Sequence, residues 1–300
     1  MRSKLGRTDM ITERAYAKIN LSLDVTGKRP DGYHEVRMVM QTVDIYDTLT
    51  FEKTEEGITI DVGGSPLPMD GDNLIHKAAK AVMDKCGITC GVSISLDKHI
   101  PIAAGMAGGS SDAAAALRGV NRLFECGLSN DELRQIGVKI GADVPYCVEG
   151  GTVLAEGIGE KLTFLSPLPE HVLAVAKPER GVSTGNIYKS LDEIFDTVVH
   201  PDVDSMLDAF KSSKDLSFTK HLGNVLEYVT VPLCPEVEEI KKIFMGSGTV
   251  GTLMTGSGPT VFAFFEDKDK AAKAIDKVRE SGLCRDEEMF VTTLTSPINS

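Results

Sequence analysis

The sequence predicts an α+β protein that folds in two parts. Its 300 residues exceed what one small hydrophobic core usually holds, so we expect two domains or one large two-part α/β unit. Segments that alternate apolar and polar residues, as strands do, occur together with segments that repeat apolar residues every three or four positions, as helices do. Hydrophobic residues at 42% and charged residues at 25% are ordinary for a globular protein.

The first clear element is a strand over residues 17–25. Apolar residues occupy alternate positions, and the positions between them hold Lys18, Asn20, Ser22 and Asp24. Because successive side chains of a strand point to opposite faces, these four form one polar face. We expect a half-buried strand whose polar face is either solvated or part of a site.

The first half of the chain then predicts further strands and three helices. A turn rich in breaker residues occupies 27–32. Asp72 is the expected N-cap of one helix, and Ser129 with Glu132 forms a capping box for another, which should end near Gly141. The expected strands are 36–45, 48–52, 58–62, 92–96 and 152–155, and the expected helices are 72–85, 113–124 and 129–141.

A linker over 165–170 (Leu-Ser-Pro-Leu-Pro-Glu) divides the chain, so we expect domains at 1–165 and 166–300. The second half predicts strands that alternate with helices. The expected strands are 172–176, a pair within 251–265, and 289–294, and the expected helices lie near 183–191, 203–211, 235–245 and 267–281.

Charge and composition exclude several classes of protein. The net charge is −12 and no long basic tract occurs, which argues against a nucleic-acid partner. No apolar run approaches the roughly 20 residues of a membrane span, and the N-terminus lacks the apolar core of a signal peptide. The six scattered cysteines show no zinc spacing, so we expect free thiols and a cytoplasmic protein.

The most informative segment is the glycine loop, residues 101–112 (Pro-Ile-Ala-Ala-Gly-Met-Ala-Gly-Gly-Ser-Ser-Asp). An alanine-rich helix follows it, so backbone N–H groups and the positive end of the helix dipole could bind phosphate. The loop lacks the Gly-Lys-Ser/Thr ending of a Walker P-loop and the spacing of a dinucleotide fold. The alternative is a flexible segment, or glycines that permit close helix packing.

Two other segments could supply catalytic groups. Lys18 and Asn20 project from the same strand face, where a lysine could steady a transferring phosphoryl group. Asp143 lies in Gly-Ala-Asp-Val-Pro, where Pro145 should hold Val144 extended and so keep Asp143 on a stiff exit from a helix. Such a carboxylate could accept a proton or hold Mg²⁺, although turn aspartates are common.

Two further segments could bind substrate. Tyr33 and His34 place an aromatic ring beside an imidazole, which could stack on a planar base and bond its edge. Residues 254–260 (Met-Thr-Gly-Ser-Gly-Pro-Thr) could form a backbone nest for an anion. A packed tyrosine and a plain Gly-Pro hairpin are the respective alternatives.

Taken together, these segments resemble the small-molecule kinases named for galactose, homoserine, mevalonate and phosphomevalonate kinases, the GHMP superfamily. The resemblance covers about residues 14–294 in matching order. Within the superfamily the chain is most similar to kinases that act on a cytidine-diphosphate-linked methylerythritol in the non-mevalonate route to isoprenoid precursors. The segments that carry the resemblance are 17–21, 29–34, 101–114, 141–145 and 256–260.

The resemblance implies a two-domain architecture with the active site in the interdomain cleft, an N-terminal ATP-binding domain and a C-terminal substrate-side domain. Asp143 would be the general base toward the 2-hydroxyl, and Lys18 would lower the pKa of that hydroxyl. Mg²⁺ would accompany ATP, with Ser110 or Ser111 within reach of it, and no separate metal site is expected. ATP would be bound by Pro101, Gly105, Met106, Ala107, Gly108, Gly109, Ser110 and Ser111, with Asn73 and Lys98 near the nucleotide.

On the substrate side the resemblance implies that Tyr33 stacks on the cytosine and His34 reads its edge. Tyr188 would lie on the other side of the base, and Asn20, Gly256 and Ser257 would position the substrate. Ala107 stands where many relatives carry glycine, with no expected loss of function. The implied partners are small molecules only, in a monomer or homodimer.

Three other functions remain open at this level. Another metabolite kinase, for homoserine or mevalonate, would not need Tyr33 and His34. A diphosphomevalonate-type decarboxylase shares a similar loop and an aspartate. A non-catalytic nucleotide sensor would not need Lys18 and Asp143.

Overall fold

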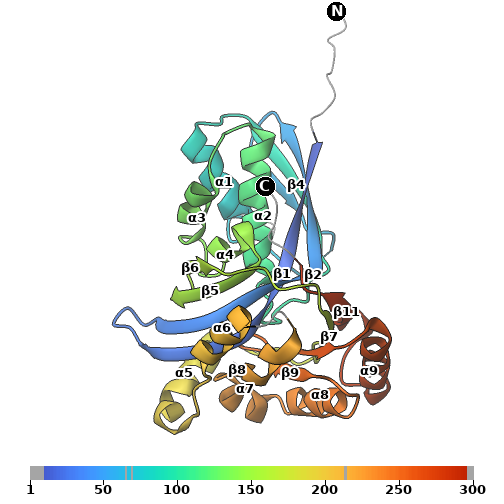
Figure 1. The fold of residues 1–300 in the computed structure, drawn as a ribbon. Coiled ribbons are helices and arrows are strands. Elements are labelled where there is room, and N and C mark those ends of the chain that lie inside the picture. Colours follow the sequence, from blue (N-terminus) through green and yellow to red (C-terminus); the bar gives the residue numbers. More distant parts are fainter. Residues whose placement is uncertain (1–9, 65, 69, 213–214, 296–300) are drawn as a thin grey trace, which may run out of the picture. The chain divides into compact units, whose positions relative to one another are not determined.

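The computed structural model describes residues 10–64, 66–68, 70–212 and 215–295 (Figure 1). These residues form two compact units that are interleaved along the chain. Unit 1 contains the chain up to Tyr16, then 46–100 and 108–149, and unit 2 contains 17–45, 101–107 and the chain from Gly150. Two long strands, β1 (Met10–Lys28) and β2 (His34–Thr54), therefore contribute residues to both units.

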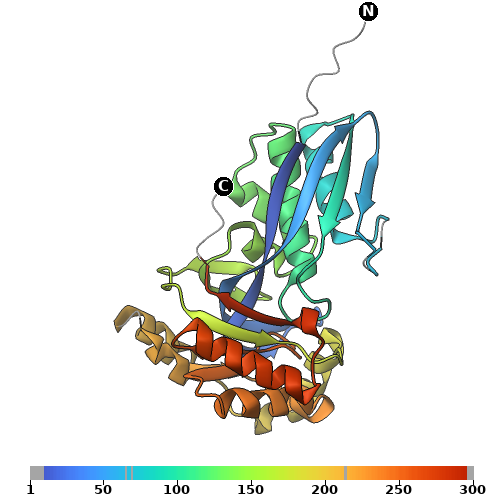
Figure 2. The ribbon, with the colours of Figure 1, turned by 90° about the vertical axis from the view of Figure 1, so that its right-hand side faces the viewer.

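Unit 1 is a sheet covered by helices on one face (Figures 1 and 2). β2 pairs antiparallel with β4 (Gly91–Asp97), and β3 (Ile58–Asp61) pairs parallel with β4. The helices are α1 (Leu74–Cys86), α2 (Gly108–Leu123), α3 (Asn130–Gly137) and α4 (Val144–Glu149). A Cβ on Gly119 of α2 would lie 2.4 Å from the Phe51 ring, so this glycine lets the helix approach the sheet closely.

Unit 2 contains two groups of strands. In one, β2 pairs with β5 (Thr152–Gly157), β5 with β6 (Lys161–Phe164), and β1 pairs parallel with β8 (Gly223–Asn224). The other is a four-stranded antiparallel sheet in the order β11 (Met289–Thr293), β7 (Val172–Ala176), β10 (Val261–Phe265) and β9 (Gly251–Met254). Its five buried β10 residues, Val261–Phe265, lie at the centre of the core of this sheet.

Helices complete unit 2. α8 (Glu236–Met245) and α9 (Lys268–Ser281) cover one face of the four-stranded sheet (Figure 2). The others are α5 (Thr184–Ile194), α6 (Val203–Ser212) and α7 (Glu227–Leu233), with short 3₁₀ turns at Phe195–Thr197, Leu216–His221 and Asp286–Glu288.

The α+β prediction is confirmed, and most predicted elements occur near their expected positions. The strand 172–176, the helix near 235–245, the strand pair and the capping box of Ser129 and Glu132 are all present. The prediction missed α7, whose seven residues include an internal proline, Pro232. A segment this short, containing a helix breaker, gives no clear helical period.

Four boundary predictions were wrong. The helix expected at 113–124 is α2, which begins at Gly108, so the last glycines and serines of the glycine loop already belong to the helix. Residues 36–45 and 48–52 form one strand, because β2 pairs with β5 over its first part and with β4 over its second. The N-cap of α1 is Asn73, whose side chain accepts the Ile75 N–H, and not Asp72. The helix α3 ends at Gly137 and a turn leads on to Gly141.

No helix within the described ranges is long and apolar enough to cross a membrane. All six cysteines are free in the structure.

Candidate active site

The polar face of β1 is buried. Lys18 is 4% exposed, Asn20 and Ser22 are 0% exposed, and Asp24 is 8% exposed. The prediction of a half-buried strand was therefore wrong, because both faces of this segment are covered. Charged and polar groups in such a place need specific partners, which a solvated strand face would not require.

Lys18 is bound to the glycine loop within unit 2. Its Nζ donates to the Asn20 Oδ1 at 2.8 Å and to the Gly105 carbonyl at 2.9 Å. Its backbone N–H also donates to the Met106 carbonyl at 3.1 Å. The structure thus brings Gly105 to Lys18, 87 positions away in the sequence, and the same ammonium also bonds Asn20.

The glycine loop and the 256–260 turn touch each other through their backbones. A Cβ on Gly105 would lie 2.4 Å from the Thr255 carbonyl, and a Cβ on Gly256 would lie 2.6 Å from the Gly105 carbonyl. Both glycines have positive φ, 71° and 57°. A side chain at either position would therefore separate the two segments. Ala107 also has positive φ, 59°, in the left-handed region that favours glycine.

Side chains that the sequence did not single out hold this turn. Thr255 Oγ1 accepts the Asn20 backbone N–H at 2.9 Å. The Asn224 amide donates to the carbonyls of Met254 and Gly256, both at 2.8 Å. Thr184 Oγ1 and Ser257 Oγ lie 2.9 Å apart. Thr255 lies within the predicted segment 254–260, although its bond to Asn20 was not predicted, whereas Asn224 and Thr184 carry no local signal.

A second group of predicted residues meets where β2 begins. The rings of His34 and Tyr188, which lies on α5, have centroids 5.1 Å apart at an interplanar angle of 38°. His34 Nε2 lies 2.7 Å from Asp192 Oδ1. Tyr33, the next residue along the chain, is 58% exposed. Tyr188, which was predicted to lie on the other side of the base, thus contacts the ring of His34.

Asp192 is a member of this group that the sequence did not reveal. Its other oxygen, Oδ2, accepts from Lys28 Nζ at 2.5 Å. The bond from Lys28 holds the pKa of Asp192 below its ordinary value, and the bond from His34 adds to this. An ionised carboxylate accepts hydrogen bonds only, so it favours the His34 tautomer that carries its proton on Nε2.

In unit 1, the start of α2 lies beside the turn that leads to Asp143. Ser111 is 1% exposed and its hydroxyl donates to the Tyr16 carbonyl. A Cβ on Gly141 would lie 3.8 Å from Ser110 Oγ. The first turn of a helix has N–H groups without helical partners, so this region can take an anion.

Asp143 immediately precedes the short helix α4. Its carbonyl accepts the Cys147 N–H at 3.1 Å, which places Asp143 at the helix start. Val144 is helical, so the expectation of an extended Val144 was wrong: a proline in the first helical turn, here Pro145, loses no hydrogen bond. Arg118 binds the other end of α4 by donating to the carbonyls of Cys147 and Val148 at 2.9 and 3.2 Å.

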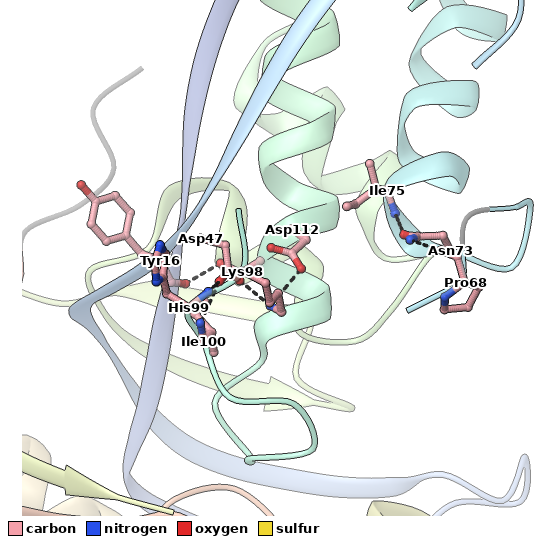
Figure 3. A network of polar contacts seen from close by, with 10 residues as sticks. Tyr16, Asp47, Pro68, Asn73, Ile75, Lys98, His99, Ile100 and Asp112 are labelled. Carbon is pink, nitrogen blue, oxygen red and sulfur yellow. Dashed lines mark hydrogen bonds and ion pairs between the residues drawn. The ribbon is translucent and has the colours of Figure 1, made fainter. Parts of the chain in front are cut away.

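Asn73 and Lys98 both make bonds within unit 1 (Figure 3). Asn73 is 6% exposed; its Oδ1 accepts the Ile75 N–H at 2.8 Å, and its Nδ2 donates to the Pro68 carbonyl at 2.6 Å. Lys98 donates to Asp112 at 3.1 Å and also to Asp47. Burial raises the pKa of Asp112 well above its ordinary value; the Lys98 charge opposes that rise and the Asp47 charge adds to it.

Two family domains match the chain. Residues 73–151 match the GHMP kinases N terminal domain, and residues 206–283 match the GHMP kinases C terminal domain. A crystal structure of 4-(cytidine 5'-diphospho)-2C-methyl-D-erythritol kinase is similar with a TM-score of 0.80 and 30% identity, covering 95% of this chain and 100% of that one. A homoserine kinase from Cytophaga hutchinsonii, with a TM-score of 0.72 and 19% identity, covers 99% of this chain and 98% of its own and shares the fold.

Curated relatives extend over nearly the whole chain. A 4-diphosphocytidyl-2-C-methyl-D-erythritol kinase of Clostridium kluyveri is 47% identical over 93% of this chain and 98% of its own. The enzyme of the same name from Caldicellulosiruptor saccharolyticus is 48% identical over 89% of this chain and 92% of its own. The fold and the matched domains thus define a GHMP kinase, an enzyme that uses ATP as co-substrate. Within that superfamily, the chain belongs to the 4-diphosphocytidyl-2-C-methyl-D-erythritol kinase family.

Proposed function

We propose that this kinase transfers the γ-phosphoryl group of ATP to the 2-hydroxyl of 4-diphosphocytidyl-2-C-methyl-D-erythritol, in the non-mevalonate (MEP) route to isoprenoid precursors. The names of its relatives support this substrate. The observation that carries the proposal is the buried Lys18 ammonium, bonded at once to Asn20 and to the carbonyl of Gly105 in the glycine loop. A lysine held there can act on an oxygen that attacks a phosphate bound by the loop.

The ATP phosphates would lie along the glycine loop and the start of α2. Backbone N–H groups there attract phosphate, and small side chains let it come close. The proposed ATP-binding residues are Pro101, Gly105, Met106, Ala107, Gly108, Gly109, Ser110 and Ser111, with Asn73 and Lys98 near the nucleotide. Residues 1–165 would accordingly be the nucleotide-side domain and residues 166–300 the substrate-side domain.

Asp143 would act as the general base and Lys18 as its partner at the attacking oxygen. Phosphoryl transfer depends mostly on alignment and on stabilising charge, so the proton of the 2-hydroxyl can leave late. Lys18 would donate to the hydroxyl oxygen and stabilise its developing negative charge.

Mg²⁺ would enter with ATP and not through a site of its own. Among the residues that the structure describes, no group of three or more His, Cys, Asp or Glu side chains could hold a metal ion. The Ser111 hydroxyl uses its proton toward Tyr16, which leaves its oxygen lone pairs as donors to a hard cation. Ser110 or Ser111 would thus hold an ion whose other ligands are phosphate oxygens, and the ion would offset phosphate charge.

At the substrate end, Tyr33 would stack on the cytosine and His34 would read its edge. The exposed ring of Tyr33 supports the first role, and the contact of His34 with Tyr188 supports a base held between aromatic groups. Asn20, Gly256 and Ser257 would position the rest of the substrate. We further propose a cytoplasmic enzyme, monomer or homodimer, whose partners are small molecules and not nucleic acid or membrane.

The test is an assay of ADP formation with purified protein, ATP and each candidate acceptor. We expect turnover with 4-diphosphocytidyl-2-C-methyl-D-erythritol and none with homoserine or mevalonate. Turnover of homoserine or mevalonate without turnover of the cytidyl substrate would show that the protein is another metabolite kinase. Release of CO₂ from a diphosphorylated acid would identify a decarboxylase, and tight ATP binding without any turnover would identify a sensor.

A further inference from the structure

Three residues of unit 1 form a buried cluster that we name the loop clamp: Asp47, Lys98 and Asp112 (Figure 3). Asp47, on β2, is 0% exposed, and Asp112, the fifth residue of α2, is 2% exposed. The Lys98 ammonium lies between them, 3.1 Å from Asp112 Oδ2 and in a shorter bond with Asp47 Oδ2. One lysine thus connects a strand to the helix that follows the glycine loop.

The clamp holds the chain on both sides of the loop. Asp47 Oδ1 accepts the backbone N–H of His99 at 2.6 Å and of Ile100 at 2.7 Å, immediately before residue 101. A Cβ on Gly108, the first residue of α2, would lie 3.0 Å from Lys98 Nζ. Residues 101–107 connect Ile100 to Gly108. The clamp therefore fixes the chain of unit 1 at both ends of this segment.

The clamp also controls charge near the start of α2. Two carboxylates close to a proposed triphosphate site would repel phosphate if nothing offset them. Lys98 lies within bonding distance of both and supplies the opposite charge. The ammonium donates one hydrogen to each of these two carboxylates, so two of its three donors are used within the protein.

We infer that Asp47, Lys98 and Asp112 are positioning residues for ATP. They align the loop, and Lys98 acts by neutralising Asp47 and Asp112 and not by contacting a phosphate. This inference rests on the proposed phosphate role of residues 101–111. It predicts that the effect of losing Lys98 depends on whether Asp112 still carries its charge.

The test compares Lys98→Met, Asp112→Asn and the double variant with wild type. The readouts are the Kd of a non-hydrolysable ATP analogue, measured by calorimetry without any second substrate, and the Tm. Lys98→Met should weaken binding about 10-fold or more, because two buried carboxylates lose their counter-charge. The double variant should bind the analogue at least about 3-fold more tightly than Lys98→Met alone, because the two sites are coupled.

A matched control is available in unit 2. Lys177 and Glu288 form another buried pair, with Nζ 2.7 Å from Oε1 and both side chains 4% exposed. Lys177→Met should lower the Tm and leave the Kd for the analogue within about 2-fold of wild type, since the pair lies at the end of β7 and the start of β11, in the other unit. An equal loss of affinity in Lys177→Met would show that general destabilisation explains the result.

Other outcomes overturn the inference or separate it from the proposed function. A double variant no better than Lys98→Met would mean that Lys98 contacts the nucleotide itself. If Lys98→Met does not fold, Asp47→Asn replaces it in the test. The asparagine keeps an oxygen that accepts from His99 and Ile100 but weakens the bond to Lys98. An unchanged Kd for the ATP analogue in this variant would contradict the inference. If the wild-type protein binds the ATP analogue but does not phosphorylate the cytidyl substrate, the proposed substrate is wrong. The comparison of Kd values among the variants still tests the loop clamp, because it needs no second substrate.

Discussion

Two regions of unit 2 differ in how firmly the protein holds them. The reaction region contains Lys18, Asn20, Gly105 and Thr255, whose polar side chains are at most 4% exposed and bonded to one another or to backbone. The recognition region contains Tyr33, His34, Tyr188 and Asp192, and there Tyr33 is 58% exposed. Under the proposed function, alignment for phosphoryl transfer would therefore be built into the packed core, whereas contact with a base would be left to a turn at the surface.

This contrast predicts that changes in the reaction region lower kcat, whereas changes in the recognition region raise KM for the cytidyl substrate. The largest expected effect is loss of the proposed base, Asp143 of unit 1, which would act together with Lys18 of the reaction region. Asp143→Ala should lower kcat by about 10³-fold or more with little change in KM, because it removes an interaction needed at the transition state. Steady-state ADP formation measures this. The exposed Asp84→Ala on α1 is the control, and equal kcat values for the two variants would contradict the role of Asp143.

Lys18→Met should have the next largest effect. It removes the donor that we propose for the attacking oxygen, the side-chain bond from β1 to Gly105 of the loop and the bond to Asn20, so kcat should fall about 10²- to 10³-fold. Lys80→Met, at an exposed position of α1, should leave kcat unchanged. If Lys18→Met changes only the KM for the cytidyl substrate, Lys18 acts in substrate binding, and the contrast between the two regions is lost.

Gly105→Ala tests the backbone contact between the loop and the 256–260 turn. The new Cβ would meet the Thr255 carbonyl at 2.4 Å at a residue with φ of 71°. We expect kcat/KM to fall about 10- to 100-fold and the Tm to fall by several degrees, because either the turn or the loop must move. Gly27→Ala, where the Cβ meets open space, is the matched control. A Gly105→Ala protein with wild-type Tm and kinetics would disprove the close contact.

His34→Ala tests the proposed role of the recognition region. Losing one imidazole at the proposed base site should raise KM for the cytidyl substrate about 10-fold and leave kcat within about 3-fold, since uniform binding is lost. His99→Ala, a histidine whose side chain is 57% exposed, should leave both constants unchanged. A fall in kcat without a change in KM would place His34 with the reacting groups.

Asp192→Asn should have the smallest effect, a rise of about 2- to 5-fold in the same KM, because it loosens His34 without removing it. The pKa of Asp192 is held below its ordinary value of 3.8, chiefly by Lys28. The carboxylate therefore contributes stability above that ordinary value and loses it only as the pH falls through the lower folded pKa. The Tm difference from wild type should be constant from about pH 5 to 8 and shrink below about pH 4; a difference that shrinks near pH 7 would contradict this.

Much of the fold follows from local sequence patterns. The strand 172–176 and the helix near 235–245 were predicted because apolar spacing is a property of neighbouring residues. The break expected after residue 45 was wrong because β2 continues between two partner strands, β4 and β5, that lie far away in the sequence. Helix ends were missed for a similar reason: competing caps such as Asp72 and Asn73 differ only in the bonds they make.

The candidate site divides in the same way. The glycine loop, the Lys18 face, Asp143 and the Tyr33–His34 pair were each visible as short motifs. Asp192 and Asp47 were not, because an isolated polar residue shows nothing of its partners. Their roles depend on contacts with residues more than fifty positions away in the chain.

By itself, the sequence determined the chemistry available to this kinase: a loop suited to phosphate, a lysine, a carboxylate and a pair of rings. Only the tertiary structure decided that the polar face of β1 is buried, that Gly105 and Gly256 touch, and that Lys98 is held between Asp47 and Asp112. The physical reason is that residue type sets which bonds a group can make, whereas burial and partner choice arise when distant segments pack together.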